Sequence, residues 1–287
     1  MRDFKSSLLD AYVRLAAAPF RLLPPRMRDI AAARLSEESA PLIGVPVAGR
    51  EILFHCPSPL AAYRARTLLT KEPDTIAWID AFAPGDVLWD VGANVGCYTL
   101  YAAARGHRCL AFEPSAANFF LLCKNIALNR LDARATAYSL AFTDQTGLGV
   151  LNATSEEIGA ALACFGEALD AVPQAGEDFP VAFRQGALGY TMDEFAARFA
   201  PPLPDHLKID VDGIEERILR GAAETLRHPG LKSELVEVDE GGESTEGAAI
   251  TALLTAAGFV LTARARSQVA PDSQFKDVRN HIYERRP

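Results

Sequence analysis

The pattern of apolar and polar residues from residue 84 onward alternates between short apolar runs and longer stretches with helical spacing. Apolar runs of strand length occur at Val87–Val91, Cys109–Glu113, His206–Val211 and Ser233–Val238, and a stretch with apolar residues three or four positions apart follows each of them. Strands that alternate with helices pair in parallel and are covered on both faces. The pattern therefore predicts an α/β fold with a mostly parallel sheet and helices on both faces.

Capping and turn residues place the other elements of this region. Thr191-Met192-Asp193-Glu194 has the form of a capping box, in which the first residue caps the helix that follows. The expected helices are Leu60–Leu69, Thr75–Phe82, Ala116–Leu128, Thr191–Phe199, Glu215–Arg227 and Glu246–Ala257. Further strands are expected at Ala135–Phe142, Phe259–Arg264 and His281–Glu284.

The tract Thr143–Tyr190 shows little periodicity apart from a hairpin signal near Leu148–Leu151. The rest of it is rich in Gly, Ala and Pro and is expected to be a loop. Because loops of this length usually serve a function, we expect this tract to shape a ligand pocket.

The first residues of the chain form a basic segment with helical patterns. Ser6–Leu23 is amphipathic, and Met27–Leu35 has a second, shorter helical pattern. Residues 1–35 hold seven Lys or Arg and three Asp, which gives this segment a net charge of +4. The segment either caps the main domain or lies as a basic amphipathic element on a membrane surface.

A hairpin pattern, Val45–Val47 with Glu51–Phe54, joins this segment to the main domain. The 287 residues suffice for one large α/β domain with additions. We therefore divide the chain into an N-terminal helical and hairpin extension, residues 1–70, and a main domain, residues 71–287.

Charge and composition exclude several classes of protein. The net charge of −8 argues against a nucleic-acid binder. The five cysteines contain no C-x-x-C pair, which fits a reducing compartment and no structural zinc. No run reaches the ~18 apolar residues that a membrane span needs. We expect a cytoplasmic protein, with peripheral membrane contact through residues 1–35 as the alternative to a purely soluble one.

The most informative segment is the turn after Val87–Val91. This run carries Asp90 and breaks into Gly92-Ala93-Asn94-Val95-Gly96 before a helical pattern begins. Such a turn holds a nucleotide-like ligand at the end of a parallel strand, because glycine permits positive φ and the helix N-terminus offers free N–H groups. The dinucleotide fingerprint would require glycine at Asn94 and Cys97. Since Asn obstructs a pyrophosphate, the loop favours S-adenosylmethionine over NAD or FAD.

An acidic residue follows at the distance expected for a ribose ligand. Glu113 ends the next strand, 23 residues after Asp90. An acid about 20 residues beyond a glycine loop accepts hydrogen bonds from ribose hydroxyls. Glu113 is therefore interpreted as the ribose-binding residue, against the alternative of a solvated acid at a strand end.

Charged residues also mark the end of a later strand, in Lys208-Ile209-Asp210-Val211-Asp212-Gly213-Ile214-Glu215. Lys208 and Asp210 point to the same side of a strand, and a lysine in a covered strand needs a partner. The pair either holds the site together or touches the cofactor and acceptor. Oxygen ligands at Asp210, Asp212 and Glu215 would suit a hard cation, but nothing else in the sequence supports a metal site and none is expected.

Together these segments resemble the FkbM family of S-adenosylmethionine-dependent methyltransferases. The matching pieces are Asp90–Gly96, Phe112-Glu113-Pro114 with Asn125 and Asn129, Ser139-Leu140-Ala141, Lys208–Glu215 with Gly221, and Glu237. The resemblance runs from about Lys71 to the C-terminus. Each piece is weak alone, and their order makes the combination specific.

The resemblance implies a Rossmann-like methyltransferase sheet of seven strands, the last two of which form an antiparallel hairpin. It implies that the methionine part of the cofactor is bound by the first loop and that Glu113 binds the ribose and Ala141 the adenine. The loop residues concerned are Asp90, Gly92, Ala93, Asn94 and Gly96. Members of the family are similar to O-methyltransferases that act on sugars, glycolipids, polysaccharides or secondary metabolites. Asp212 stands where many members carry Glu.

The expected chemistry is transfer of an activated methyl group to a hydroxyl, which must lose its proton. Asp210 is the expected general base, with Lys208 or Glu237 in support. Two other interpretations remain open: a nicotinamide-dependent oxidoreductase on a Rossmann sheet, and a non-catalytic binding protein that keeps the methyltransferase fold. The sequence does not indicate which acceptor is methylated or the oligomeric state.

Overall fold

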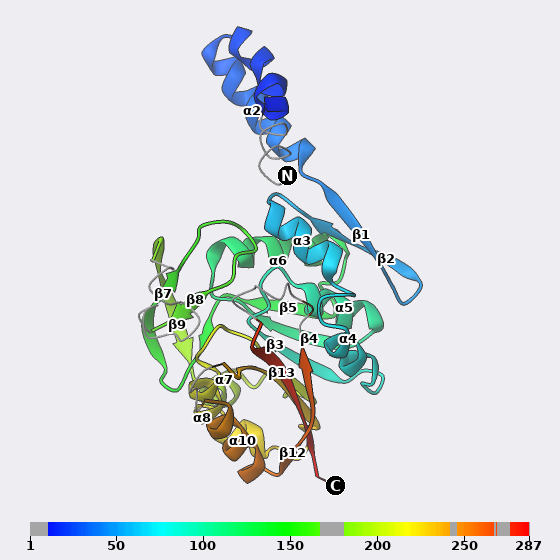
Figure 1. Cartoon of the computed structure of the whole chain (residues 1–287), viewed down its shortest axis with the longest axis vertical. Helices are drawn as coiled ribbons and strands as arrows, with labels where there is room; N and C mark the ends of the chain where they lie inside the picture. Colours follow the sequence, from blue (N-terminus) through cyan, green and yellow to red (C-terminus); the bar gives the residue numbers. More distant parts are fainter. Residues whose placement is uncertain (1–10, 167–180, 242–245, 267, 269–275, 287) are drawn as a thin grey trace. The chain divides into compact units, whose positions relative to one another are not determined.

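The computed structural model describes residues 11–166, 181–241, 246–266, 268 and 276–286. The chain divides into two compact units, Met1–Pro41 and Leu42–Pro287. The larger unit contains all the strands and most of the helices (Figure 1).

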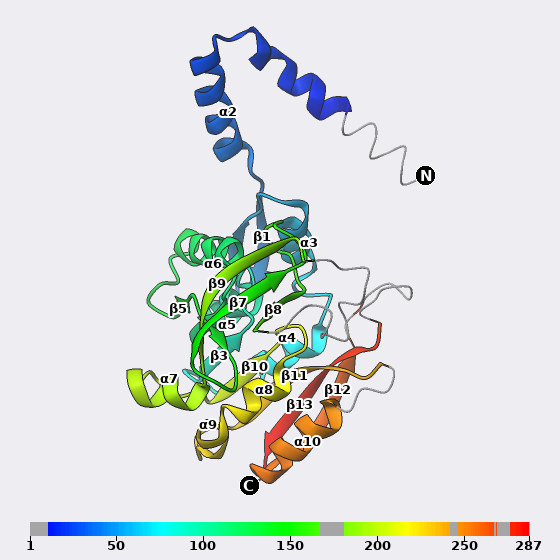
Figure 2. The same cartoon turned by 90° about the vertical axis from the view of Figure 1, so that its left-hand side faces the viewer.

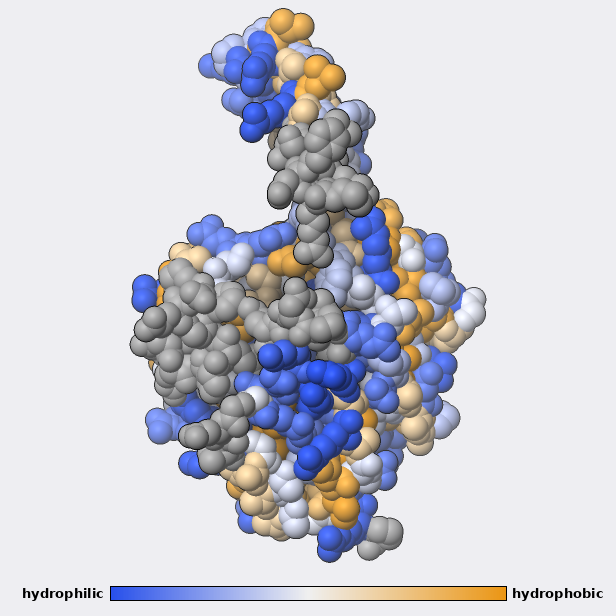
Figure 3. Space-filling model, in the orientation of Figure 1, coloured by the Kyte–Doolittle hydropathy of each residue, from blue (hydrophilic) through white to orange (hydrophobic). Residues whose placement is uncertain are grey.

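The smaller unit is helical over most of residues 11–39, and none of its residues from 11 to 41 is buried. Residues 11–17 are helical, followed by the 3₁₀-helix η1 (Ala18–Leu22) and helix α2 (Pro25–Ser39). In Figure 3 apolar and polar side chains lie next to one another on this unit. Its exposed large apolar residues are Tyr12, Val13, Leu15, Leu22, Met27, Ile30 and Leu35. The two predicted helices are present in the described part, the predicted start at Ser6 lies outside the described residues, and the membrane-surface interpretation stays a prediction.

The core of the larger unit is a seven-stranded sheet in the order β12-β13-β11-β10-β3-β4-β5. The strands are β3 (Val87–Val91), β4 (Arg108–Phe112), β5 (Ala135–Tyr138), β10 (His206–Ile209), β11 (Ser233–Asp239), β12 (Phe259–Arg266) and β13 (Val278–Arg285). Every pairing from β11 to β5 is parallel, whereas β13 runs antiparallel to both β11 and β12. The expected α/β sheet with a final antiparallel hairpin is confirmed.

Two apolar cores cover the two faces of this sheet, because alternate strand residues point to opposite sides. On β3, Leu88 belongs to one core while Trp89 and Val91 belong to the other. Figure 2 shows the helices in these two groups. The Leu88 core includes residues of α3 (Pro59–Thr67), α4 (Pro73–Asp80), α5 (Cys97–Arg105) and α6 (Ala116–Leu128), and the Trp89 core includes residues of α7 (Met192–Phe199), α8 (Glu215–Arg220), α9 (Ala223–Arg227) and α10 (Glu246–Ala256).

A second sheet occupies much of the tract that we expected to be a loop. Its strands, in the order β6-β9-β7-β8, are β6 (Ala141–Phe142), β7 (Gly147–Ala153), β8 (Ala163–Phe165) and β9 (Phe183–Tyr190). The loop prediction was therefore wrong over β8 and β9, whereas β7 contains the strand signal expected near Leu148–Leu151; residues 167–180 lie outside the described part. Glycines in β7 and β9 weakened the strand signal, and they are there because the ring of Phe165 packs against Gly149 and Gly189.

Two predicted elements are divided in the structure. The expected strand Ala135–Phe142 becomes β5 and β6, which belong to different sheets. The expected helix Glu215–Arg227 becomes α8 and α9, which are separated at Gly221. A side chain at Gly221 would collide with the backbone oxygen of Thr143, so the close approach of these segments interrupts the helix.

The hairpin of β1 (Leu42–Val47) and β2 (Arg50–His55) packs on the larger unit rather than standing apart. The side-chain oxygens of Asn129 and Asn125 on α6 accept hydrogen bonds from the backbone N–H groups of Leu53 and His55, at 2.7 and 2.9 Å. The structural division therefore falls at Pro41 and not at residue 70. In the part of the chain that the structure describes, none of the helices combines the length and the apolar character of a membrane span.

Candidate active site

A cavity of about 590 Å³ opens at the carboxyl ends of β3, β4, β10 and β11. Five of the ten predicted site residues line it: Gly92, Asn94, Glu113, Asp210 and Glu237. Other lining residues come from α3, from Lys71, from Asp212 and from residues 154–163. The cavity therefore lies where ligands bind in open α/β sheets.

The loop after β3 has a backbone that only certain residues can adopt. Gly92 has a φ of +80° and a side chain there would collide with the carbonyl oxygen of Asp210. Asn94 also has a positive φ, of +51°, which Asn tolerates better than most residues. This conformation lets its backbone N–H donate to Glu113 Oε2 at 2.8 Å, while its side-chain Oδ1 is buried without a hydrogen-bond partner in the described chain.

Gly96 and Ala93 shape the loop without lining the cavity. Gly96 caps α5 with a φ of +91°, and an added Cβ would lie 2.6 Å from side-chain atoms of Leu100 and Leu122. Gly96 therefore leaves room for the packing of two helices and not for a ligand. Ala93 is buried, with 4% of its surface exposed.

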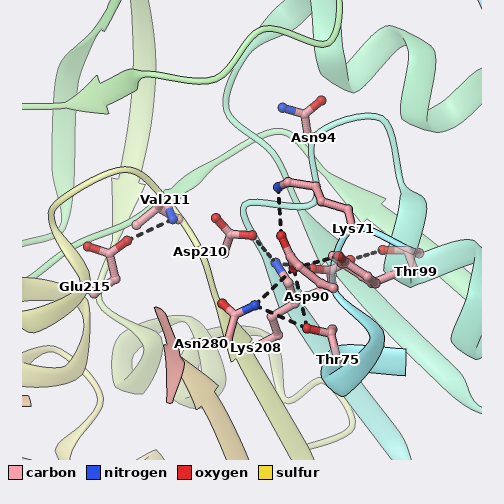
Figure 4. A network of polar contacts seen from close by, with 12 residues as sticks. Lys71, Thr75, Asp90, Asn94, Thr99, Lys208, Asp210, Val211, Glu215 and Asn280 are labelled. Atoms are coloured by element: carbon pink, nitrogen blue, oxygen red, sulfur yellow. Dashed lines mark hydrogen bonds and ion pairs between the residues drawn. The ribbon is translucent and has the colours of Figure 1, made fainter. Parts of the chain in front are cut away.

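Lys208 lies between two aspartates beneath the cavity (Figure 4). Its Nζ is 2.8 Å from Asp210 Oδ2 and 3.6 Å from Asp90 Oδ1, and it lies 5.2 Å from the ring centre of Tyr98. Lys208 and Asp90 are each 1% exposed, and Asp90 Oδ2 accepts a hydrogen bond from Thr99 Oγ1 at 2.6 Å. Burial would lower the pKa of Lys208, but Asp210 and Asp90 hold it above its usual value. The predicted ion pair is present, and Asp90 lies behind the cavity lining.

A second ion pair, not anticipated from the sequence, continues this network. Lys71 Nζ contacts Glu72 Oε1 at 2.7 Å, and Tyr98 donates to Glu72 Oε2 at 2.6 Å. Burial alone would raise the pKa of Glu72, but Lys71 and the hydrogen bonds hold it at about 2. Lys71 and Glu72 are adjacent, but Tyr98 comes from a separate segment, so no local motif marks the network. In the sequence, the only sign of this network was the position of Glu72 directly before the first proline of a helix.

Glu113 lies at the end of β4 with both carboxylate oxygens turned to backbone N–H groups. Oε2 accepts from Asn94 and Oε1 from Ser115, each at 2.8 Å. Burial raises its pKa to about 7, although these two hydrogen bonds oppose the shift. The residue is in position to exchange one backbone partner for a ribose hydroxyl.

Ala141 lies in a small void adjoining the main cavity. This void is also lined by Gly92 and Pro114, which belong to the lining of the main cavity. Its other neighbours include Phe112 and Phe142, so the surroundings are apolar. The prediction that Ala141 contacts an adenine is compatible with this position and stays a prediction.

The remaining carboxylates have different surroundings. Glu237 lines the cavity, and burial together with Asp210 and Asp212 raises its pKa well above the usual value. Burial and Asp210 raise the pKa of Asp212 to about 6, and its Oδ2 accepts from Leu162 N–H at 2.7 Å. Glu215 accepts from the backbone N–H groups of Val211 and Gly213 at 3.1 and 2.9 Å, so it braces that turn (Figure 4).

Metal ligation does not emerge from these carboxylates. Across the described ranges, no group of three or more His, Cys, Asp or Glu has the arrangement of a metal site. The oxygens of Glu215 accept hydrogen bonds from the backbone N–H groups of Val211 and Gly213.

Residues 154–162 form a strap along the cavity and belong to the tract Thr143–Tyr190 that we expected to shape a ligand pocket. Asn94 Nδ2 and Asn118 Nδ2 donate to Ala160 O at 2.9 and 3.2 Å, and Asn118 Oδ1 accepts from Gly159 N–H at 2.7 Å. Arg64 Nε donates to Gly159 O at 2.7 Å. The strap is thus tied to the predicted cofactor loop and to α3.

The polar groups that line the cavity suit S-adenosylmethionine. Gly92 lines the cavity with its backbone, Asn94 holds an unused buried oxygen, and Glu113 offers a carboxylate to the cavity, where ribose binding stays a prediction. Residues 90–261 match the methyltransferase FkbM domain. The chain belongs to the methyltransferase FkbM family. This membership confirms the resemblance and identifies the cofactor as S-adenosylmethionine, and it sets aside the nicotinamide interpretation.

Individual relatives of this FkbM chain are distant. Hexuronic acid methyltransferase AglP from Haloferax volcanii is 24% identical over 235 residues, which cover 81% of this chain and 87% of that protein. The crystal structure of methyltransferase FkbM from Methylobacillus flagellatus KT has a TM-score of 0.46 at 14% identity, with 79% of this chain and 55% of that chain covered. Magnesium protoporphyrin IX methyltransferase (ChlM) from Synechocystis PCC 6803, with bound SAM, gives 0.46 at 12% identity, covering 80% and 85%.

The raised pKa of Glu113 predicts a pH-dependent affinity for S-adenosylmethionine. Only the ionised carboxylate accepts hydrogen bonds at both oxygens, and burial places its pKa at about 7 in the free protein. Between pH 6 and pH 8 the ionised fraction rises roughly tenfold, so the affinity should rise by about the same factor. Calorimetric titration at several pH values measures this. Glu113→Gln should bind weakly with a flatter profile; an unchanged slope in that variant would remove Glu113 as the cause.

Proposed function

We propose that this protein is an S-adenosylmethionine-dependent O-methyltransferase that methylates a hydroxyl of a sugar, free or within a glycolipid or polysaccharide. Membership of the FkbM family supports the methyltransferase activity. The hexuronic acid methyltransferase at 24% identity supports a sugar acceptor over a secondary metabolite. We also propose that residues 71–287 carry the reaction, while residues 42–70 complete one side of the cavity.

The observation that carries the proposal is the state of Asp210. Its Oδ2 is held by the buried Lys208 at 2.8 Å, and 28% of its side chain is exposed where it lines the cavity. A carboxylate fixed at one oxygen and open at the other can accept a proton from a ligand. Glu237 lies in the same cavity with a raised pKa, which suits it to donate a hydrogen bond.

The residues of the chain then have separate tasks. Bound S-adenosylmethionine supplies an activated methyl group, so the rate depends mainly on aligning the acceptor oxygen. Glu113 and the Gly92–Gly96 loop hold the cofactor. Asp210 accepts the proton that the hydroxyl loses, and Lys208 keeps Asp210 in position.

Asp210→Asn should keep cofactor binding and lose turnover. The amide oxygen can still accept a hydrogen bond from Lys208, so the site keeps its shape while the base is removed. We expect the S-adenosylmethionine dissociation constant to stay within about tenfold and kcat to fall about 10²- to 10⁴-fold. Calorimetry and transfer of a labelled methyl group measure the two effects. The exposed Asp132→Asn is the matched control, and full turnover in the Asp210 variant would contradict the assignment.

The nature of the product tests the acceptor group directly. A methyl ether on a sugar hydroxyl survives mild alkali, whereas a methyl ester of a carboxylate is hydrolysed. We propose the ether. An alkali-labile product would mean that an already ionised oxygen is methylated, and Asp210 would then have no proton to accept. A protein that binds S-adenosylmethionine but labels no extract fraction would favour the non-catalytic interpretation.

A further inference from the structure

We infer that Arg64 and Tyr63 of α3 form an acceptor subsite for an acidic sugar. Arg64 binds the carboxylate of the sugar, and the ring of Tyr63 lies against the face of the sugar ring. The inference rests on the proposed function, whose acceptor class it narrows to uronic acids.

Helix α3 holds both residues at the cavity. Ser58 caps this helix by accepting a hydrogen bond from Ala61 N–H, and Ala61, Ala62 and Ala65 bury its inner face. Tyr63 and Arg64 line the cavity. The helix lies outside the matched family segment, residues 90–261. We therefore assign the residues of α3 to the acceptor, which is specific to this protein, and the matched segment to the methyl donor.

Arg64 is held in a fixed direction. Its Nε donates to Gly159 O at 2.7 Å, and the residue is half-buried. A guanidinium has further N–H groups on its two terminal nitrogens. In the part of the chain that the structure describes, these terminal nitrogens make no ion pair. The hydrogen bond through Nε thus leaves the edge that binds carboxylates in a bidentate manner available.

The other cations of the site are already paired. Lys71 contacts Glu72 at 2.7 Å, and Lys208 contacts Asp210 at 2.8 Å. Arg64 differs from them because it faces the cavity without an acid in contact. A guanidinium stays charged at every physiological pH, so its partial burial is best compensated by an anionic ligand.

Two ligands could bring a carboxylate to this cavity: the acceptor sugar and the methionine part of the cofactor. Lys71 interacts electrostatically with Asp210 and Glu237, whereas Arg64 acts on Glu113 and Asp212. Glu113 marks the ribose, so the methionine end extends away from it toward Lys71. The ammonium of Lys71 has three donors and its contact with Glu72 uses one of them, so we assign the methionine carboxylate to the neighbourhood of Lys71 and leave Arg64 for the acceptor.

Tyr63 supplies the second element of a sugar site. Its side chain lines the cavity, yet 47% of its surface is exposed. Large aromatic rings that remain exposed at a cavity present an apolar face and a polar hydroxyl to ligands. The C–H face of a pyranose packs against such a ring, while the sugar hydroxyls remain free for hydrogen bonds.

The test compares acidic and neutral sugars on the full chain saturated with S-adenosylhomocysteine. The probes are the methyl glycosides of glucuronic and galacturonic acid, each against methyl glucoside or methyl galactoside, with binding followed by ligand-observed NMR and calorimetry. At least one acidic glycoside should bind about tenfold tighter than its neutral counterpart. Arg64→Gln, which can still donate to Gly159 O, should remove this preference. Tyr63→Ala should weaken both members of a pair.

The controls separate the alternatives. Arg66→Gln removes an exposed arginine of the same helix and should change nothing. Above pH 8, where Glu113 is ionised with or without the charge of Arg64, S-adenosylmethionine affinity should stay within about twofold in Arg64→Gln; a tenfold loss with the acidic preference intact would assign Arg64 to the cofactor and overturn the inference. Equal binding of acidic and neutral glycosides by the wild type would also overturn it. Failure of the wild type to bind S-adenosylmethionine at all would instead reject the proposed function.

Discussion

Gly92→Ala is expected to lose S-adenosylmethionine binding by more than about 100-fold and to lower the free energy of unfolding by about 2 kcal/mol or more. Two effects combine at this position. The φ of +80° is strained for any residue with a Cβ, and that Cβ would collide with the carbonyl oxygen of Asp210. The loop and the end of β10 must therefore separate, which moves both the cofactor loop and the proposed base.

Two glycine controls distinguish the collision from the strain. Gly85 has a φ of +87° with open space around it, so Gly85→Ala should cost only about 1–2 kcal/mol of strain. Gly147 has open space and no positive φ, so Gly147→Ala should be nearly neutral. Urea unfolding and calorimetric titration measure the three variants. If Gly92→Ala resembled Gly85→Ala in both measurements, the close approach of the two strand ends would have no energetic importance.

Lys208→Met should be the most destabilising charge substitution, with a loss of about 3–5 kcal/mol in the free energy of unfolding. Methionine fills the space of the lysine stem but leaves Asp90 buried without its countercharge. Asp90 is 1% exposed and its Oδ1 already has no hydrogen-bond partner in the described chain. Asp210 would also lose the contact that positions it, so turnover should fall with stability.

Lys232→Met provides the matched comparison for this ion pair. Lys232 contacts Asp86 at 2.6 Å and Asp205 at 2.9 Å, but its side chain is 48% exposed. Exposed ion pairs contribute at most about 1 kcal/mol, and the substitution should leave methyl transfer unchanged. If urea unfolding showed similar losses in the free energy of unfolding for the two Lys→Met variants, burial would not be the reason that the Lys208 ion pairs stabilise the protein.

The sheet could be predicted from the sequence because its central strands β3 and β4 are mostly apolar and regular helical patterns follow them. The loop from Gly92 to Gly96 and the acid Glu113 were also recognisable, because each lies within or directly after a single strand and can be read from a short stretch of sequence. Gly96 was assigned to ligand contact, yet it makes room for Leu100 and Leu122. Residue type alone could not separate a glycine that approaches a ligand from one that approaches a helix.

The parts of the site that escaped prediction depend on contacts between distant segments. Glu72 receives hydrogen bonds from Tyr98 and Asn280, which are 26 and 208 residues away. The second sheet was hidden because Gly149 and Gly189 interrupt its apolar pattern in order to accept the ring of Phe165. These contacts form only when the chain folds, so the local periodicity of the sequence cannot show them.

The β1–β2 hairpin packs on α6, and α3 contacts the strap, so residues 42–70 approach the cavity from outside the matched segment. Hydrogen bonds join the hairpin to Asn125 and Asn129, and join Ser58 and Arg64 to residues 158 and 159 of the strap. An exchange of this segment between family members would replace one side of the acceptor site and leave the donor loops intact. Diversification of acceptors could thus proceed by recombination at one short segment, without a new methyl-transfer centre.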